Sequence, residues 1–485
     1  MNYRVVLYIL GWIMNIEAAF MLMPCAVAAI YGEKEGFAFL WVLIGCAFIG
    51  SFMVLHRPKD MNFYVKEGFV TVSLSWIVLS IIGCLPFYIN GDIPHFVDAL
   101  FETISGFTTT GATILSDVEG LSRCSLFWRS FTHWIGGMGV LVFLLAIVPM
   151  AGGSHMNLMK AESPGPSVGK LVPKVKSTAK ILYIIYIVLT IIEIIFLLCG
   201  GMSVFESVTT SFATAGTGGF GIRNDSLMSA SPYIQWVVTI FMILFGVNFG
   251  AYFLIIMGKF KQAFKYEEVR AYIAIILASS AIIFVNIYDK MESAADAIRH
   301  AVFQVASIIT TTGYASVDYN QWPETSKTVL VILMFVGACA GSTGGGIKVS
   351  RFIIAVKSFF KEIISYLHPR SVKKVKMEGK VVEHEVLRAT NVYFLTFMLL
   401  FAVSLFLVSF ENRDFATNFT AVATTLNNVG PGLNDVGPVE NFGGFTTFSK
   451  CVLMFDMLAG RLELFPLLLL FCPTVWKPKK KSGVA

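Results

Sequence analysis

The stretch that decides the fold reads Phe-Glu-Thr-Ile-Ser-Gly-Phe-Thr-Thr-Thr-Gly and occupies residues 101–111. A second stretch, Phe-Gln-Val-Ala-Ser-Ile-Ile-Thr-Thr-Thr-Gly at residues 303–313, has the same length and the same ending. In both, a short apolar segment leads into the Thr-Thr-Thr-Gly loop. Apolar segments of roughly 10–14 residues are too short to cross a bilayer and suit re-entrant helices. The two stretches therefore predict a repeated unit in which a half-length helix ends in a glycine-bearing loop.

Two more degenerate copies of this unit follow the same plan. Residues 204–212 lead into Thr-Gly-Gly-Phe at 217–220, and residues 415–426 lead into Asn-Asn-Val-Gly at 427–430. In the former, Gly216 and Gly219 both remain possible equivalents of Gly313, and Gly219 is preferred because Phe220 then mirrors Tyr314. Four recurrences indicate four quasi-equivalent units around one axis. The alternative is that all four are outer loops with ordinary turn glycines.

The composition places these units in a membrane. Of the 485 residues, 56% are hydrophobic and only 14% are charged, against about 25% charged in an average soluble domain. The apolar residues form blocks of roughly 20, the length of a helix that spans ~30 Å of hydrocarbon. Ten spans are expected, at 5–30, 37–55, 68–88, 127–150, 180–199, 233–257, 271–288, 327–358, 391–410 and 449–472. The first is too long for a secretory leader and is interpreted as a retained span.

The distribution of basic residues predicts the orientation. Alternate connections, at 56–69, 151–180, 258–270, 351–388 and 477–485, carry 25 of the 37 Lys and Arg residues. By the positive-inside bias these connections and both termini are expected in the cytoplasm. The net charge of +6 is thus explained by topology and by anionic lipid, without a nucleic-acid partner. Acidic residues of the outer connections, Glu102 among them, either attract cations to a pore mouth or are plain surface charges.

The loops suit the handling of a dehydrated cation. A ring of backbone carbonyls can replace the hydration shell of an ion, and glycine allows those carbonyls to turn toward the axis without a side chain in the lumen. A helix whose C-terminal end faces the ion adds about half a negative charge. The pattern therefore predicts a cation pore built from four loops.

The span after the third loop contains a glycine run, Gly344 to Gly346, which is expected to break the helix because each glycine costs about 1 kcal/mol relative to alanine. The run is not a phosphate-binding loop, because Ile347 stands where that motif has lysine. The glycines of Gly-Gly-x-Gly at 136–139 and of Gly-x3-Gly at 246–250 are explained by close helix packing.

Two cations, Lys348 and Arg461, are expected within the membrane, where a charge usually faces a cavity or a partner. Our hypothesis is that Arg461 faces the pore as an electrostatic barrier and that Lys348 holds the glycine run. The alternative is a pair between Arg461 and Glu463 or Asp456 that only fixes packing.

These residues resemble the Trk/Ktr/HKT superfamily of potassium transporters over the whole chain. The motifs are 101–111, 308–314, Gly-Ser-Thr-Gly-Gly-Gly-Ile-Lys at 341–348 and Ala-Gly-Arg-Leu-Glu at 459–463. The resemblance implies an all-α polytopic protein with two leading helices (1–66) and four pore repeats (67–158, 159–265, 266–380 and 381–485). It implies a filter at Thr110, Gly111, Gly218, Gly219, Thr312, Gly313, Val429 and Gly430, and a gate at Gly344, Gly345, Gly346, Lys348 and Arg461. Glycine at the first filter position, where sodium-preferring relatives have serine, favours potassium.

The expected function is uptake of potassium and rubidium across a bacterial inner membrane through a gated pore. A proton- or sodium-coupled symporter and a channel-like subunit of a potassium pump remain alternatives. The chain shows no motif of an enzyme and no cofactor site, so potassium is expected only as the permeant ion. The resemblance implies a homodimer and a cytosolic nucleotide-binding regulatory subunit of the TrkA type.

Overall fold

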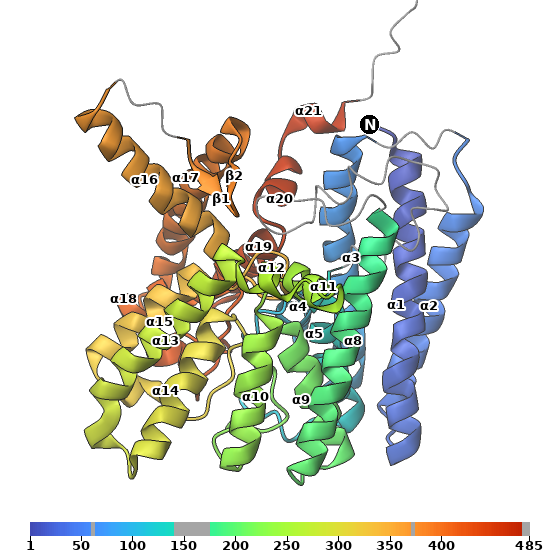
Figure 1. The fold of residues 1–485 in the computed structure, drawn as a ribbon. Helices are drawn as coiled ribbons and strands as arrows, with labels where there is room; N and C mark the ends of the chain where they lie inside the picture. Colours follow the sequence, from blue (N-terminus) through green and yellow to red (C-terminus); the bar gives the residue numbers. More distant parts are fainter. Residues whose placement is uncertain (60–63, 140–174, 370–373, 478–485) are drawn as a thin grey trace, which may run out of the picture.

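The computed structural model describes residues 1–59, 64–139, 175–369 and 374–477. Most of its long helices lie along one common axis, and the N-terminus and the last described helix are at the same end (Figure 1). The helices are α1 Tyr3–Tyr31, α2 Gly36–Leu55, α3 Val65–Asn90, α4 Phe96–Phe107, α5 Arg123–Gly137, α8 Val175–Cys199, α9 Val204–Gly216, α10 Pro232–Phe245, α11 Phe249–Ile256, α12 Phe260–Phe264, α13 Glu267–Ile287, α14 Ala294–Ile309, α15 Glu324–Val336, α16 Val349–Leu367, α17 His384–Val408, α18 Phe415–Leu426, α19 Thr447–Arg461, α20 Phe465–Leu469 and α21 Pro473–Trp476. A two-stranded antiparallel hairpin, β1 Lys376–Met377 and β2 Lys380–Val381, precedes α17.

Six helices of the described chain are long and apolar enough to cross a membrane, or seven if the bent pair α10 and α11 forms one span. The six are α1, α2, α3, α8, α13 and α17, and each coincides with an expected span. The prediction of a polytopic helical membrane protein is confirmed. The expected span 127–150 is described only as far as residue 139, and most of the connection 151–180 lies outside the described residues.

The other expected spans are interrupted, and two predictions of continuous helices were wrong. The segment 233–257 is divided into α10 and α11, which meet at 89°. The segment 449–472 ends its first helix at Arg461, and α20 begins only at Phe465. The break in the third repeat extends from Gly337 to Lys348, so it is wider than the three consecutive glycines. At the breaks of the second and third repeats, backbone bonds between the two segments replace helical bonds, as from the N–H of Cys339 to the carbonyl of Gly246. At the break between α19 and α20 the backbone bonds are local turns, as from the N–H of Leu464 to the carbonyl of Ala459.

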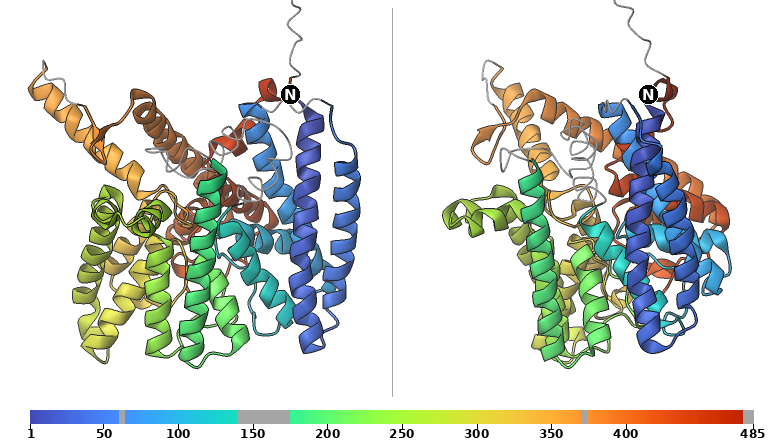
Figure 2. Two further views of the ribbon diagram at one scale, coloured as in Figure 1. Left: turned by 45° about the vertical axis from the view of Figure 1, so that its right-hand side comes forward. Right: turned by 90° about the vertical axis from the view of Figure 1, so that its right-hand side faces the viewer.

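Four short helices, α4, α9, α14 and α18, lie between longer helices at the positions where re-entrant segments were expected. Each short helix packs against longer ones: α4 against α3, α9 against α8, α14 against α13 and α18 against α17, in the bundle that Figure 2 shows from two further sides. Residues on their inner surfaces are almost completely buried, for example Phe101 and Phe303, each 0% exposed. The short helices thus form the core around which the spans pack.

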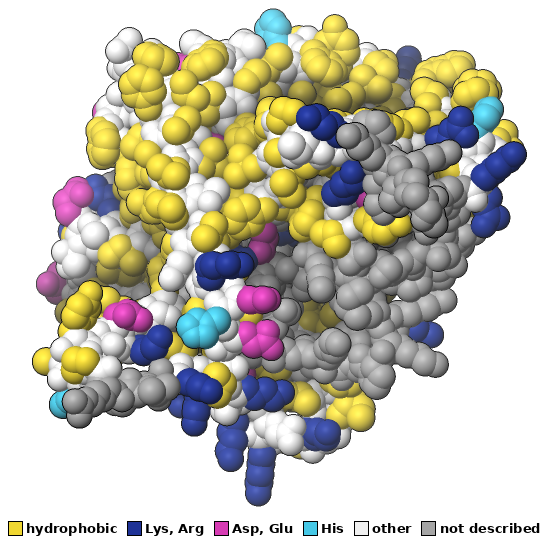
Figure 3. Space-filling model, turned by 90° about the horizontal axis from the view of Figure 1, so that it is seen from above, with side chains coloured by type: hydrophobic (Ala, Val, Ile, Leu, Met, Phe, Trp, Pro, Cys, Tyr) yellow, Lys and Arg dark blue, Asp and Glu magenta, His cyan; other side chains and the backbone are white. Residues whose placement is uncertain are grey.

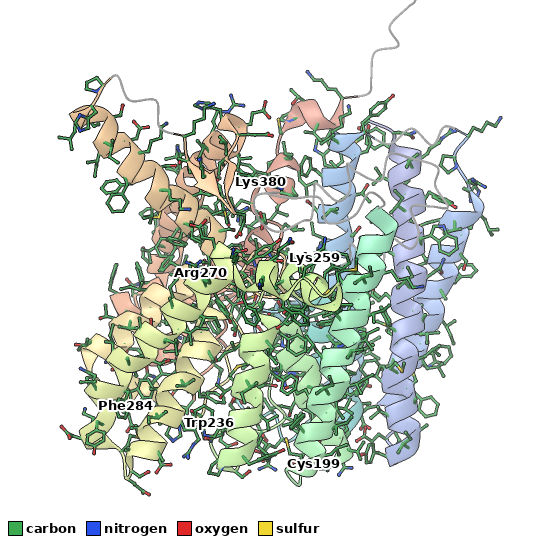
Figure 4. All side chains as sticks on the ribbon, in the orientation of Figure 1. Cys199, Trp236, Lys259, Arg270, Phe284 and Lys380 are labelled. Atoms are coloured by element: carbon green, nitrogen blue, oxygen red, sulfur yellow. The ribbon has the colours of Figure 1, made fainter. Side chains whose placement is uncertain are left out.

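Basic side chains gather at one end of the molecule. Lys259, Arg270 and Lys380 lie in the half that carries the N-terminus, whereas Cys199 lies at the opposite end (Figure 4). Seen from above, Lys and Arg side chains line the lower edge of this face (Figure 3). Lys374, beside the hairpin, and Lys376, in β1, are exposed.

Candidate functional site

The four glycine-bearing loops share one backbone conformation. Each short helix ends within a few residues of a loop in which two left-handed positions are separated by one residue. The first left-handed positions are Thr109, Thr217, Thr311 and Asn428, with φ of 54°, 54°, 59° and 55°, and the second are Gly111, Gly219, Gly313 and Gly430, with φ of 79°, 74°, 84° and 101°. Gly216, the other possibility for the second loop, is the last residue of α9. The backbone therefore places Gly219 in the position equivalent to Gly313.

The four loops contact one another in cyclic order. A Cβ atom at Gly111 would collide with the carbonyl oxygen of Gly218, and one at Gly219 would collide with that of Thr312. A Cβ atom at Gly313 would collide with the carbonyl of Val429, and one at Gly430 would lie 2.7 Å from the carbonyl of Thr110. Each glycine thus faces the carbonyl that precedes the glycine of the next loop, and the fourth loop closes on the first. A side chain at any of the four would break this ring.

The ring encloses polar backbone rather than side chains. Thr110, Thr312 and Val429 are each 0% exposed, whereas Gly111, Gly219 and Gly313 are partly exposed. Because α4, α9, α14 and α18 end at these loops, four helix C-termini converge on the ring. Each C-terminus carries a partial negative charge of about half an elementary charge. The site is therefore suited to a cation.

Threonine and asparagine side chains fix the loops in place. Thr108 Oγ1 lies 2.8 Å from Thr110 Oγ1 in the first loop, and the equivalent pair in the third loop is 2.7 Å apart. Asn428 Nδ2 donates to Thr110 Oγ1 at 2.9 Å and to the carbonyl of Met457 at 2.9 Å. Asn428 therefore joins the fourth loop to the first, which closes the ring.

A buried ion pair connects the segments that follow the first two loops. Arg129 Nη2 lies 2.7 Å from Glu102 Oε1, and both side chains are almost fully buried. Arg129 also donates to the carbonyl of Gly221 at 3.1 Å and lies 4.1 Å from the centre of the Phe220 ring. The interpretation of Glu102 as a cation-attracting or surface charge was wrong, because this carboxylate is paired inside the protein.

His133 also connects these two loops. Its Nδ1 lies 2.8 Å from the carbonyl of Gly106, and its Nε2 accepts from the N–H of Phe220 at 3.2 Å. Since Nε2 is an acceptor, Nδ1 carries the proton, and the ring is neutral in this arrangement. This role could not be predicted from the sequence, because the groups that His133 binds, at Gly106 and Phe220, lie 27 and 87 residues away along the chain.

The segment 337–348, called the glycine loop below, lies against the ring. Gly345 donates from its N–H to Thr311 Oγ1 at 2.6 Å, and a Cβ atom at Gly345 would lie 2.7 Å from the carbonyl oxygen of Asn427. Thr343 Oγ1 donates to the carbonyl of Phe245, the last residue of α10, at 3.2 Å. The glycine loop therefore contacts the second and fourth repeats as well as the loop of its own repeat.

Lys348 and Arg461 both donate to backbone carbonyls at this level. Lys348 is 3% exposed, and its Nζ donates to Gly344 and, at 3.0 Å, to Gly345. Arg461 donates to the carbonyls of Gly136 and Gly137 at the end of α5 and to that of Thr343 at 3.0 Å. Arg461 thus links the first repeat to the glycine loop.

Glu463 and Asp456, the acidic residues considered as partners of Arg461, also contact other side chains. Glu463 forms an ion pair with Arg351, whose guanidinium lies 3.9 Å from the centre of the Tyr393 ring. Asp456 accepts from Ser404 Oγ at 2.7 Å. Both contacts fix the packing around α19.

Comparisons with known proteins agree with this architecture. The family model described as TrkH, cation transport protein, matches residues 35–479. The Trk system potassium uptake protein TrkH of Salmonella typhimurium is 36% identical over 488 residues, which covers 98% of this chain and 100% of that protein. The Trk system potassium uptake protein TrkG of Escherichia coli is 32% identical and covers 98% of this chain and 99% of that protein.

A solved structure resembles the chain over nearly its whole length. The crystal structure of the potassium transporter TrkH from Vibrio parahaemolyticus has a TM-score of 0.88 and 33% sequence identity, and it covers 98% of this chain and 100% of that chain. The superfamily resemblance inferred from the motifs is confirmed. This chain belongs to the TrkH family of cation transport proteins.

Proposed function

We propose that the chain takes up potassium, and rubidium in its place, through a pore whose selectivity filter is the ring of four loops. The observation that carries this proposal is the cyclic contact of Gly111, Gly219, Gly313 and Gly430 with the next loop's carbonyl. The relatives named as potassium uptake proteins support the choice of ion. The filter consists of these glycines with Thr110, Gly218, Thr312 and Val429.

In this proposal, backbone carbonyl oxygens coordinate the permeating ion. An ion entering the ring exchanges water oxygens for carbonyl oxygens, and the four converging helix C-termini lower the energy of a cation there. Gly313 and its equivalents have no Cβ, so the lumen stays wide enough for a dehydrated ion. No covalent step is needed, which is consistent with a family of transporters.

The glycine loop is the gate in this proposal. Gly344 and Gly345 are buried against the ring, and Gly346 has a φ of 74° that glycine tolerates. Lys348 holds the loop through the carbonyls of Gly344 and Gly345. Arg461 places a positive charge beside the loop and opposes the passage of a cation until the loop moves.

The assembly and orientation are proposed on sequence grounds. The basic connections favour a bacterial inner membrane with both termini in the cytoplasm. The family resemblance favours a homodimer and a cytosolic nucleotide-binding regulatory subunit of the TrkA type. The repeats divide the chain at 1–66, 67–158, 159–265, 266–380 and 381–485, and the boundary at 158 lies outside the described residues.

The test is rubidium flux into liposomes that contain the purified chain and are loaded with potassium. Uptake driven by the potassium gradient alone, and reduced by external potassium more than by sodium, is expected. Gly313→Ser should lower uptake by at least tenfold, because its Cβ would collide with the carbonyl of Val429. Gly258→Ala is the matched control, since Gly258 also has a positive φ but nothing within 4 Å of the added Cβ. Uptake that requires a proton or sodium gradient would contradict the pore and indicate a coupled transporter.

A further inference from the structure

A single buried carboxylate ties the glycine loop to α13. Glu268 is 2% exposed, and its Oε1 accepts from the N–H of Ala340 at 2.6 Å and from that of Ser350 at 3.1 Å. Its Oε2 accepts from Asn248 Nδ2, between α10 and α11, at 3.2 Å. Ala340 precedes the glycine run and Ser350 follows it. One side chain therefore holds both flanks of the run.

The residue before it, Glu267, contacts the hairpin β1–β2. Glu378 at the hairpin turn accepts from the N–H of Glu267 at 2.7 Å, which caps the start of α13. Lys357 of α16 forms an ion pair with Glu267 and donates to the carbonyl of Lys376 at 2.8 Å. Two adjacent residues at the start of α13 thus connect the hairpin to the glycine loop.

Hydrogen bonds to carboxylates make the connection between the hairpin and the glycine loop rigid. Hydrogen bonds to a carboxylate are about twice as strong as neutral ones, and a buried carboxylate is costly unless all its partners stay in place. The first N–H groups of α13 have no acceptor inside the helix, and Glu378 accepts from that of Glu267. A displacement of the hairpin removes this cap and shifts the first turn of α13, from which Glu268 extends.

We propose that Glu268 is a positioning residue of the gate and that the hairpin controls it through Glu378 and Glu267. The hairpin lies at the end of the molecule that carries the N-terminus, where a partner can reach it without entering the membrane (Figure 1). Any partner that moves the hairpin therefore changes the support of the glycine loop. This inference rests on the proposed function, because it assigns regulation to the gate of that pore.

Cys339 provides a reporter that does not depend on flux. It belongs to the glycine loop and is 0% exposed, with its N–H donating to the carbonyl of Gly246 at 3.1 Å. We would measure its alkylation by N-ethylmaleimide in the purified full chain, by mass spectrometry of the peptide that contains it. Rubidium flux would be followed on the same preparations in liposomes.

Glu268→Gln should raise the alkylation rate of Cys339 about tenfold. The amide nitrogen that takes the place of Oε2 cannot accept from Asn248 Nδ2, and the negative charge that strengthens the other bonds is lost. Adding Asn248→Asp should restore a slow rate, since the introduced carboxylate accepts from that amide. Glu378→Ala, at the surface and away from the core, should raise the rate about threefold. Glu383→Ala should leave it unchanged, because Glu383 is exposed and makes no capping bond to α17.

The outcomes separate this inference from the proposed function. Faster alkylation in both variants together with higher rubidium flux supports both. Faster alkylation together with flux that requires a proton or sodium gradient supports the linkage and overturns the pore. Selective flux with the wild-type alkylation rate in Glu378→Ala overturns the linkage and leaves the pore standing. Equal melting temperatures of the Glu378→Ala variant and the wild type exclude unfolding as the cause of a faster rate.

Discussion

The second spans of repeats two and three both break beside the ring, but for different reasons. In repeat three α15 ends at Val336, and the next residue, Gly337, has a φ of 71° and a ψ of −173° that only glycine adopts readily. In repeat two α10 and α11 meet at 89° with ordinary backbone angles at Gly246 and Asn248. The break in repeat two is made by tertiary bonds, since the carbonyl of Gly246 accepts from Cys339 and the N–H of Phe249 donates to the carbonyl of Gly341.

The difference shows which kind of irregularity a sequence reveals. A run of glycines marks backbone that other residues cannot adopt, so the break in repeat three could be predicted. The bend in repeat two uses an Asn248 cap on the N–H of Gly250 at 2.8 Å and bonds to a distant loop. The cap is local but Asn248 alone does not predict a bend, and the bonds to the distant loop leave no local pattern. Gly246 was therefore interpreted as a packing residue.

The largest effect is expected for Gly345→Ala in repeat three. The added Cβ would lie 2.7 Å from the carbonyl oxygen of Asn427 and 2.9 Å from Asn428 Cβ, so the backbones on both sides must move. Overpacking of this kind costs about 3 kcal/mol. We expect a clear drop in melting temperature and altered rubidium flux. A variant with wild-type stability would mean that the loop does not press against the ring.

Gly246→Ala in repeat two should cost less, about 2 kcal/mol. The added Cβ would meet the hydroxyl of Tyr272 and would lie 2.9 Å from Thr310 Cγ2, and both are ends of side chains that can shift. Tyr272→Phe should recover part of the loss, although it removes a bond from the tyrosine hydroxyl to the carbonyl of Ile243 at 3.2 Å. Thermal unfolding of the two single variants and the double variant measures this coupling. Strict additivity would contradict the contact.

Asn248→Ala should destabilise by about 1 kcal/mol through loss of the helix cap. Asn248→Ser is the matched control, because serine can still cap the N–H of Gly250. If both variants unfold at the same reduced temperature, the cap is not what holds the bend and the contact with Glu268 must account for it.

Gly341→Ala should cost only about 1 kcal/mol, the penalty for an L-residue in a left-handed conformation. Its φ of 68° disfavours a side chain, but the nearest atom to the added Cβ is Asn248 Oδ1 at 3.6 Å. The substitution therefore measures backbone strain without a collision. A loss as large as that of Gly345→Ala would show that strain, rather than packing, dominates in the glycine loop.

The sequence predicted the helical membrane fold and the four short helices, because apolar length and repeated loops are local signals. It missed the residues that act across repeats. Glu268 and His133 lie far along the chain from the N–H groups of Ala340 and Phe220 that they bind. The same holds for Asn428 and Thr110, although Asn428 was recognised as part of the fourth loop. Long-range partners of single polar residues leave no periodicity, so only the fold brings them into view.

The central claim is that the ring binds the permeant ion, and anomalous diffraction from crystals grown in rubidium tests it most directly. The account predicts an anomalous peak inside the ring, bounded by the carbonyl oxygens of Thr110, Gly218, Thr312 and Val429. Gly313→Ser should weaken that peak while leaving any surface sites unchanged. Rubidium peaks only at the surface, in crystals of a protein that transports rubidium, would contradict the account and place the pathway elsewhere.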